Sequence, residues 1–448
     1  MSFRPLAEVV LVSALLLGAA LGGERHFRRI GVPAPLAFLL AGLGLGSIWP
    51  SAASAVTPQR LTVVGTLALI VILLQGGLDC GLAAIRRELA PVISLGLCGT
   101  AATFGLLALS AHVAIGLGWT AALILGAILS PTDPAAVFSV LGGWRERGGR
   151  VVRLLEGEAG LNDPVAIALV IALVDASGDG DISPLAILGR IAVEGAVGAV
   201  VGLGAGALVA RALGPSWPVV RMAPALAVLA AGLATFGLAT LAHGSGFLAV
   251  YLCGLVLGDD RDLPERSEVL AFTAELASLA EISMFVLLGV ALASVAIASV
   301  LVDGLILAAV LVLLVRPAIV FPLLRRLGFD AREATFATIA GLKGAVPILL
   351  AAIPLMSQVD DAPQIFGIVG VAVLASLAVQ GVVLAPRRAE AARRAGLRLT
   401  AGSGSRRRGR SRSDAGRARP PRSCAGAGSR RRAGSGRRRR RDPPRPRP

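Results

Sequence analysis

The segment LSPTDPAAVF, from Leu129 to Phe138, interrupts an apolar run that is otherwise long enough to cross a lipid bilayer. Pro131 and Pro134 each remove a backbone hydrogen-bond donor and disfavour helix at the residue before them. We therefore expect a membrane helix that breaks around Thr132 and Asp133. Free carbonyl groups should lie at this break, close to the middle of the span.

A second segment, AGLKGAVPILLA from Ala340 to Ala351, has the same character. Gly341, Gly344 and Pro347 interrupt it, and it carries Lys343, the only lysine of the chain. Two broken helices at corresponding positions of two halves are the best sequence indication of a transporter site.

The composition places both segments in a membrane protein. The chain has 448 residues, of which 55% are hydrophobic and 16% charged, with a mean hydropathy of +0.76, more than a soluble core could hide. We count thirteen apolar runs and expect an all-α polytopic membrane protein with about thirteen transmembrane helices. The runs are Leu6 to Gly23, Ala34 to Trp49, Pro58 to Asp79, Pro91 to Leu117, Thr120 to Leu141, Val151 to Val174, Pro184 to Leu213, Met222 to His243, Ser245 to Gly258, Val269 to Ala296, Ser299 to Arg326, Ala331 to Ile353 and Gln364 to Ala385.

The two broken runs are the fifth and the twelfth in this count. If the first six and the last six spans form two units around the seventh, each broken helix is the fifth of its unit. A spacing of seven spans also gives the two units opposite orientations in the bilayer. We therefore expect two inverted six-helix repeats whose broken helices cross.

Basic residues are distributed unevenly between the two sides of the membrane. Sixteen of the 21 in the apolar body lie in the odd-numbered breaks between spans. Short cytoplasmic loops are enriched in Lys and Arg. The bias predicts a multi-pass protein of the cell (inner) membrane with the N-terminus outside and the C-terminus in the cytoplasm.

The chain divides at about residue 386 into a transmembrane domain, 1–386, and a tail, 387–448, with 23 arginines and three acids. Its Arg, Gly, Ser and Pro composition is typical of disorder, and its charge favours contact with anionic lipid. No nucleic acid is expected as a partner, because no aromatic residues interleave the arginines. A reading-frame artefact is a further explanation of the tail.

Three charged residues stand near span centres: Asp133, Asp163 and Lys343. A charge at mid-bilayer costs about 2.5 to 3.5 kcal/mol, so each needs an explanation. Asp133 and Lys343 have the signs that would neutralise the facing ends of half-helices. Low dielectric surroundings disfavour the charged form of a carboxylate, so Asp163 could hold either a proton or an alkali cation. A structural ion pair or a packing hydrogen bond is the alternative for both aspartates.

Asp163 lies in EGEAGLNDPVAIALV, the sixth span. Glu156 is seven residues earlier, so it should share one helical face with Asp163 and line the access path. Glu158 points about 140° away from Asp163, and we expect it to pair with Lys343. Arg316 is more typical of a packing or snorkelling residue.

Other kinds of function have little support in the sequence. We find no nucleophile and base pair, metal cluster or phosphate-binding loop, so we expect no enzyme, no catalytic residue and no cofactor. The scattered cysteines are interpreted as packing residues. Glu281, near the middle of the tenth span, could be functional or structurally paired, and the sequence leaves both open.

Seven motifs, in this order, make residues Leu6 to about Ala385 resemble the NhaP-type monovalent cation/proton antiporter family, most closely its potassium/proton branch. They are VPAPLAFLLAGLGLG, ILLQGGL, SPTDPAAVFSVL, EGEAGLNDPVAIAL, GSGFLAVYLCGLVLG, ISMFVLLGV and GLKGAVPILLAAIPLM. The resemblance implies electroneutral exchange of K⁺ or Na⁺ for H⁺ by alternating access, a role in pH homeostasis, and a homodimer with core and dimerisation domains.

The resemblance also assigns roles to residues. Asp163 would carry the ion or proton with Asn162 beside it, and Thr132 and Asp133 would form the crossing of the unwound helix. Glu158 and Lys343 match a structural ion pair, in which the basic position is usually Arg.

Three departures from the family pattern concern the same region. Gln75 stands where many members have an acidic residue, Ala159 replaces a common Ser ligand, and Glu281 stands where Gln is usual, adding a carboxyl that could replace the one missing at Gln75. A channel-like cation pathway and a transport-inactive membrane subunit are therefore alternatives to antiport. The sequence does not separate K⁺ from Na⁺ or Li⁺.

Overall fold

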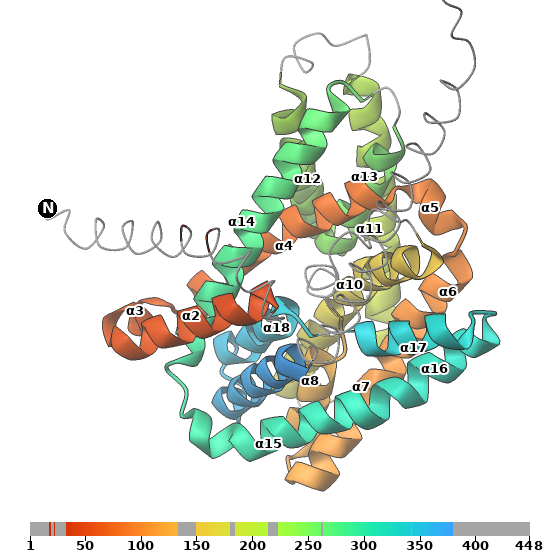
Figure 1. Cartoon of the computed structure of the whole chain (residues 1–448). Coiled ribbons are helices and arrows are strands. Elements are labelled where there is room, and N and C mark those ends of the chain that lie inside the picture. Colours follow the sequence, from red (N-terminus) through yellow and green to blue (C-terminus); the bar gives the residue numbers. More distant parts are fainter. Residues whose placement is uncertain are drawn as a thin grey trace, which may run out of the picture. The chain divides into compact units, whose positions relative to one another are not determined.

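The computed structural model describes residues 33–132, 149–179, 184–213, 223–260, 263–341 and 343–379, together with Gly18 and Gly22. Every regular element in these ranges is a helix, as expected (Figure 1). Apart from Gly18 and Gly22, the first expected span lies outside the described residues, as do Asp133 and the Arg-rich tail.

The described chain contains the following helices in order. They are α2 (Ala34–Ile48), α3 (Pro50–Ala55), α4 (Pro58–Cys80), α5 (Leu82–Arg86), α6 (Leu89–Ile93), α7 (Thr100–Ser110), α8 (Trp119–Ile128), α10 (Arg150–Asp179), α11 (Pro184–Leu213), α12 (Pro224–Leu241), α13 (Gly246–Asp259), α14 (Arg266–Leu292), α15 (Ile297–Val310), α16 (Arg316–Arg326), α17 (Ala331–Ala340), α18 (Ala345–Met356) and the helix Ala362–Val379. Two short π-helical segments, Ser94–Gly99 and Leu311–Val315, join helices of the same span, and a third, Ala111–Ile115, ends the span that begins at Leu89.

The spans agree with the hydropathy prediction. Within the described residues, eight helices are long and apolar enough to cross a membrane, one further span is a bent pair, and three shorter helices are also apolar. These segments lie over the expected runs from Ala34 onward. The total of thirteen spans and the inverted repeat stay predictions.

Both breaks appear in the described chain. α8 ends at Ile128, and Pro131 and Thr132 are not helical, which agrees with the effect expected of the prolines. The path of this span beyond Thr132 lies outside the described residues. The other break separates α17 from α18, whose axes differ by 42°.

Six helices pack on one another through glycines and form what we call the glycine-packed group: α2, α4, α11, α12, α13 and α14. Gly42 of α2 meets the Val286 carbonyl of α14 so closely that a methyl group would collide with it, and Gly289 does the same at Leu39. On α11, glycines 198, 202 and 206 lie against α13. Small residues let membrane helices approach closely, which explains this packing.

A second set of packed helices, the polar-centred group, comprises α7, α8, α10, α15, α16, α17 and α18. One end of it is held by charge: Glu88 accepts from Arg150 at 2.9 Å and lies 3.7 Å from Arg153. Arg150 also donates to the Gly328 carbonyl at 3.1 Å and stacks on the Phe329 ring. Helices α10 and α18 contact both groups, so their residues lie at the boundary between them.

Candidate functional site

The middle of α10 carries the buried polar residues on which the site is built. Asn162 is fully buried, and Glu158 and Asp163 are only 3% and 5% exposed. Pro164 lies within the helix directly after Asp163. Because proline has no N–H, the carbonyl of Gly160 cannot accept the usual helical hydrogen bond from residue 164. A carboxylate and a weakened backbone turn therefore occur together at the centre of this span.

A chain of hydrogen bonds joins α10 to the broken fifth span. The Asn162 amide Nδ2 donates to Thr132 Oγ1 at 2.8 Å, and the Thr132 hydroxyl donates to Glu158 Oε1 at 3.3 Å. Thr132 is 5% exposed and has no helical geometry, so its position depends on this chain. The hydrogen bond from Asn162 brings Thr132 of the broken span to the helix that carries Asp163, whereas Asp133 lies outside the described residues.

The ion pair of Glu158 differs from the sequence prediction. Arg316 Nη1, at the start of α16, lies 3.3 Å from Glu158 Oε1, and both side chains are buried. Arg316 also donates to the carbonyls of Ala337 and Thr338, both 3.3 Å away, at the C-terminal end of α17. A cation is favoured there because the last carbonyls of a helix have no helical partner.

Gly341 explains why the guanidinium can occupy this place. A Cβ at position 341 would overlap the Arg316 guanidinium, so the arginine lies where any other residue would carry its side chain. The sequence interpretation treated Arg316 as a packing residue. The sequence did contain an indication of this ion pair. Glu158 needs a cation within the membrane, and both Arg316 and Lys343 were available.

Lys343 has another set of partners. Its Nζ donates to the carbonyls of Pro131 at 2.7 Å and Ser130 at 3.0 Å, the free carbonyls expected after α8. The predicted pair of Glu158 with Lys343 is thus replaced by two contacts, Glu158 with Arg316 and Lys343 with the broken span. The ammonium is fully buried and joins the two breaks directly.

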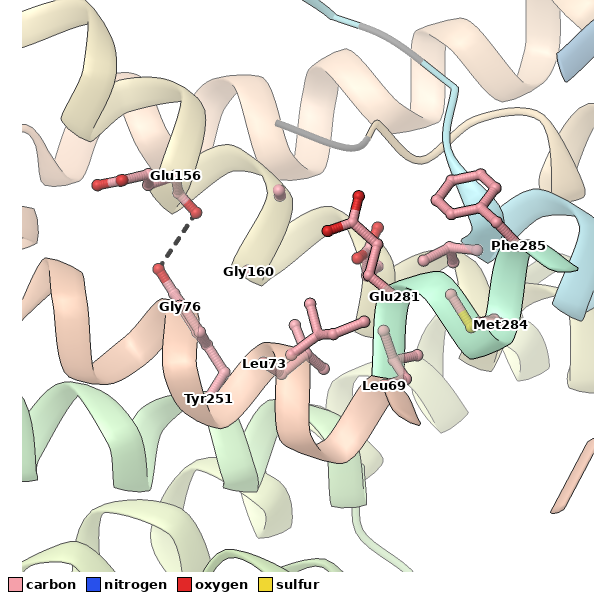
Figure 2. Close-up of a pocket in the computed structure, with 13 residues that line it drawn as sticks. Leu69, Leu73, Gly76, Glu156, Gly160, Tyr251, Glu281, Met284 and Phe285 are labelled. Atoms are coloured by element: carbon pink, nitrogen blue, oxygen red, sulfur yellow. Dashed lines mark hydrogen bonds between the residues drawn. The ribbon is translucent and has the colours of Figure 1, made fainter. Parts of the chain in front are cut away.

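Asp163 lines a cavity of about 80 Å³ at the boundary of the two helix groups. The polar-centred group contributes α10 and α18, and the glycine-packed group contributes α4, α13 and α14. Glu156 and Glu281 line the same cavity, so the expectation that Glu156 shares a face with Asp163 is met. Figure 2 shows Glu281 extending from α14 into the space beside the α10 turn that carries Gly160.

Tyr251 of α13 forms one wall of the cavity. Its hydroxyl donates to the Glu156 carbonyl at 3.3 Å (Figure 2). Gly160 allows this close approach, because a Cβ there would overlap the tyrosine ring. Tyr251 therefore joins α13 to α10 between the two helix groups.

Several buried oxygens have no hydrogen-bond partner in the part of the chain that the structure describes: Asn162 Oδ1, Glu158 Oε2 and Gln75 Oε1. Gln75 is 6% exposed on α4, but it does not line the cavity. Alkali cations take hard oxygen ligands, and the carboxyl, amide, hydroxyl and carbonyl oxygens around Asp163 are of that kind.

Residues 11–387 match the family model described as "Sodium/hydrogen exchanger, transmembrane". The chain belongs to this family. This sodium/hydrogen exchanger family member is 36% identical over 384 residues to a K⁺/H⁺ antiporter NhaP of Alkalimonas amylolytica, covering 84% of this chain and 66% of the relative. It is 33% identical over 383 residues to a K⁺/H⁺ antiporter NhaP2 of Shewanella sp. (strain MR-4), covering 84% and 65%. The chain therefore spans just under two thirds of the length of these relatives.

The exchanger family member also shares its fold with a solved antiporter. The structure of the sodium proton antiporter MjNhaP1 from Methanocaldococcus jannaschii at pH 8 matches with a TM-score of 0.70 and 22% identity, covering 85% of this chain and 99% of that one. The predicted resemblance to NhaP-type antiporters and the all-α membrane fold are confirmed.

Proposed function

We propose that the protein is a secondary transporter that exchanges a monovalent cation, K⁺ or Na⁺, for H⁺, with Asp163 as the carboxylate that binds each in turn. The supporting observation is the place of Asp163, which is 5% exposed and lines a cavity between helices of the two groups. Membership of the sodium/hydrogen exchanger family supports the same activity.

The chemistry follows from the surroundings of the carboxylate. Inside the membrane the ionised form of Asp163 needs a compensating positive charge, which a proton or an alkali cation supplies. Since one carboxylate accepts one of the two, their binding is competitive. Each cycle then moves one positive charge in each direction, and exchange is electroneutral.

The fixed charges around Asp163 have structural roles in this proposal. Arg316 compensates Glu158, and Lys343 compensates the carbonyls of the broken span. The hydrogen bond between Asn162 and Thr132 holds the turn of α10 that carries Asp163 against the broken fifth span. The same two side chains would supply neutral oxygens for the cation.

Alternating access would come from movement of the polar-centred group relative to the glycine-packed group. The cavity lies on their boundary, and Leu69, Leu73 and Gly76 of α4 face it with apolar or small surfaces along which α10 can slide. Asp163 and Val346 lie on the moving side. This division corresponds to the core and dimerisation domains expected in a homodimer.

We further propose that the protein lies in the cell membrane with the N-terminus outside and the C-terminus in the cytoplasm. The transmembrane domain, 1–386, carries the exchange, and the tail, 387–448, binds anionic lipid of the inner leaflet. The partners are then the bilayer and a second copy of the chain. No resident cofactor takes part, because the alkali cation is the cargo.

The test is a fluorescent-dye assay of the pH gradient in everted membrane vesicles, from cells that lack their own cation/proton exchangers. Addition of K⁺ or Na⁺ should collapse the gradient with the wild type and leave it intact with Asp163→Asn. An imposed cation gradient should also drive proton movement in reverse, which a channel without coupling does not do. Equal activity of the variant and the wild type would refute the role of Asp163.

A further inference from the structure

Glu281 is the one carboxyl group that the glycine-packed group contributes to the described lining of the Asp163 cavity. It lies on α14 and is half-buried, between apolar residues of α4 and the side chains of Met284 and Phe285. The other two carboxyl groups, Glu156 and Asp163, come from α10. The cavity thus receives carboxylates from both helix groups.

Carboxylates that face so small a cavity from two different helices favour a bound cation. Two like charges repel each other in low dielectric surroundings, and a cation placed between them relieves the repulsion. Glu281 thus adds a charged oxygen ligand to the cavity that Asp163 lines. The site therefore offers more coordination than Asp163 alone provides.

The two carboxylates belong to bodies that move against each other in the proposed transport cycle. Asp163 travels with α10, whereas Glu281 stays with α14. In that cycle Glu281 would face the ion in only one of the two access states. The cavity extends from Asp163 to Glu156, toward the Arg150 end of α10, which the charge bias of the loops assigns to the cytoplasm.

We propose that Glu281 is a second carboxylate ligand for the transported cation, present only when Asp163 faces the cytoplasm. It gives the cytoplasmic side of the exchanger the higher affinity for the cation. This inference rests on the proposed function and deepens it, because it assigns different ligand sets to the two access states of one site.

The test uses Glu281→Gln, which replaces the carboxylate with a neutral amide of the same size. It compares the half-saturating cation concentration on the two faces of the membrane. K⁺ and Na⁺ are each titrated against everted vesicles, which expose the cytoplasmic face, and right-side-out vesicles, which expose the other. The half-saturating concentration should rise roughly ten-fold on the cytoplasmic face and stay within about two-fold outside. Glu275→Gln, an exposed position on the same helix, should match the wild type on both faces.

An equal rise of the half-saturating concentration on both faces, or no change on either, would overturn the inference. A merely structural role of Glu281 would affect both faces alike. Glu281→Asp covers the case in which the Gln variant does not fold. This variant withdraws the carboxylate toward α14. The half-saturating cation concentration should then rise by less than in the Gln variant, and only on the cytoplasmic face. A wild type that shows no exchange at all would refute the proposed function, and the inference with it.

Discussion

The two helix groups are held together in different ways. In the glycine-packed group, α2 and α14 approach until Gly42 and Gly289 touch the opposite backbone, and no described charged side chain of the group is fully buried. In the polar-centred group, the contacts at the centre are Glu158 with Arg316 and Lys343 with Pro131. The first arrangement makes a rigid support, and the second concentrates buried charge where the chain is broken. A substitution should therefore act through packing in one group and through charge in the other.

The largest effect is expected at the centre of the polar-centred group. Arg316→Met leaves Glu158 buried without its partner, and breaking such a pair costs about 3 to 5 kcal/mol. The loss should appear as a lower melting temperature of the purified protein in detergent. The double variant Arg316→Met with Glu158→Met should recover most of the stability, since no unpaired charge remains. If the single and double variants are equally unstable, the pair does not hold this group together.

A smaller effect is expected from packing in the other group. Gly289→Ala introduces a methyl group against the Leu39 carbonyl, and overpacking of this kind costs about 1 to 3 kcal/mol. Gly237→Ala on α12 is the matched control, because no atom of the described residues lies within 4 Å of its Cβ position. The control should stabilise the helix by about 0.5 to 1 kcal/mol. Thermal unfolding should show a lower melting temperature for Gly289→Ala and a higher one for Gly237→Ala. Equal changes in the two variants would contradict the packing account.

The smallest change in stability is expected at the link between the break and α10. Thr132→Val removes the hydroxyl that accepts from Asn162, at a cost of about 1 kcal/mol. The effect on exchange should be larger than the effect on folding, because Asn162 and the Asp163 turn lose their anchor. Transport rates and melting temperatures measured on the same preparation separate the two. Thr132→Ser keeps the hydroxyl and should behave as the wild type.

The sequence was informative about where the breaks and buried charges lie, and less so about which charges meet. Pro131 and Pro134 lie close together and each removes a backbone donor, so the end of α8 near them could be predicted from local chemistry. The direction of Glu158 also follows from helix geometry. Whether Arg316 or Lys343 lies opposite it depends on how α16 packs on α17 around Gly341, and periodicity within one helix contains no such information.

The same distinction applies to the cavity. Glu156 and Asp163 share one helix, so their common face was predictable from a spacing of seven residues. Glu281 reaches that cavity from α14, and Gln75 of α4 does not line it. Their relative places depend on the rotation of two further helices. The resemblance to NhaP-type antiporters drew attention to both positions, and only the packed structure distinguishes them.

The central claim is that one carboxylate, Asp163, binds the cation and the proton in competition. The most direct measurement is the half-saturating cation concentration for exchange, determined in proteoliposomes at a series of pH values equal on both sides. Competition predicts that, where the site is mainly protonated, this concentration rises about ten-fold for each unit of decrease in pH, while the maximal rate at saturating cation changes little. A half-saturating concentration that is independent of pH would show that the two ions bind at separate sites and would contradict the account.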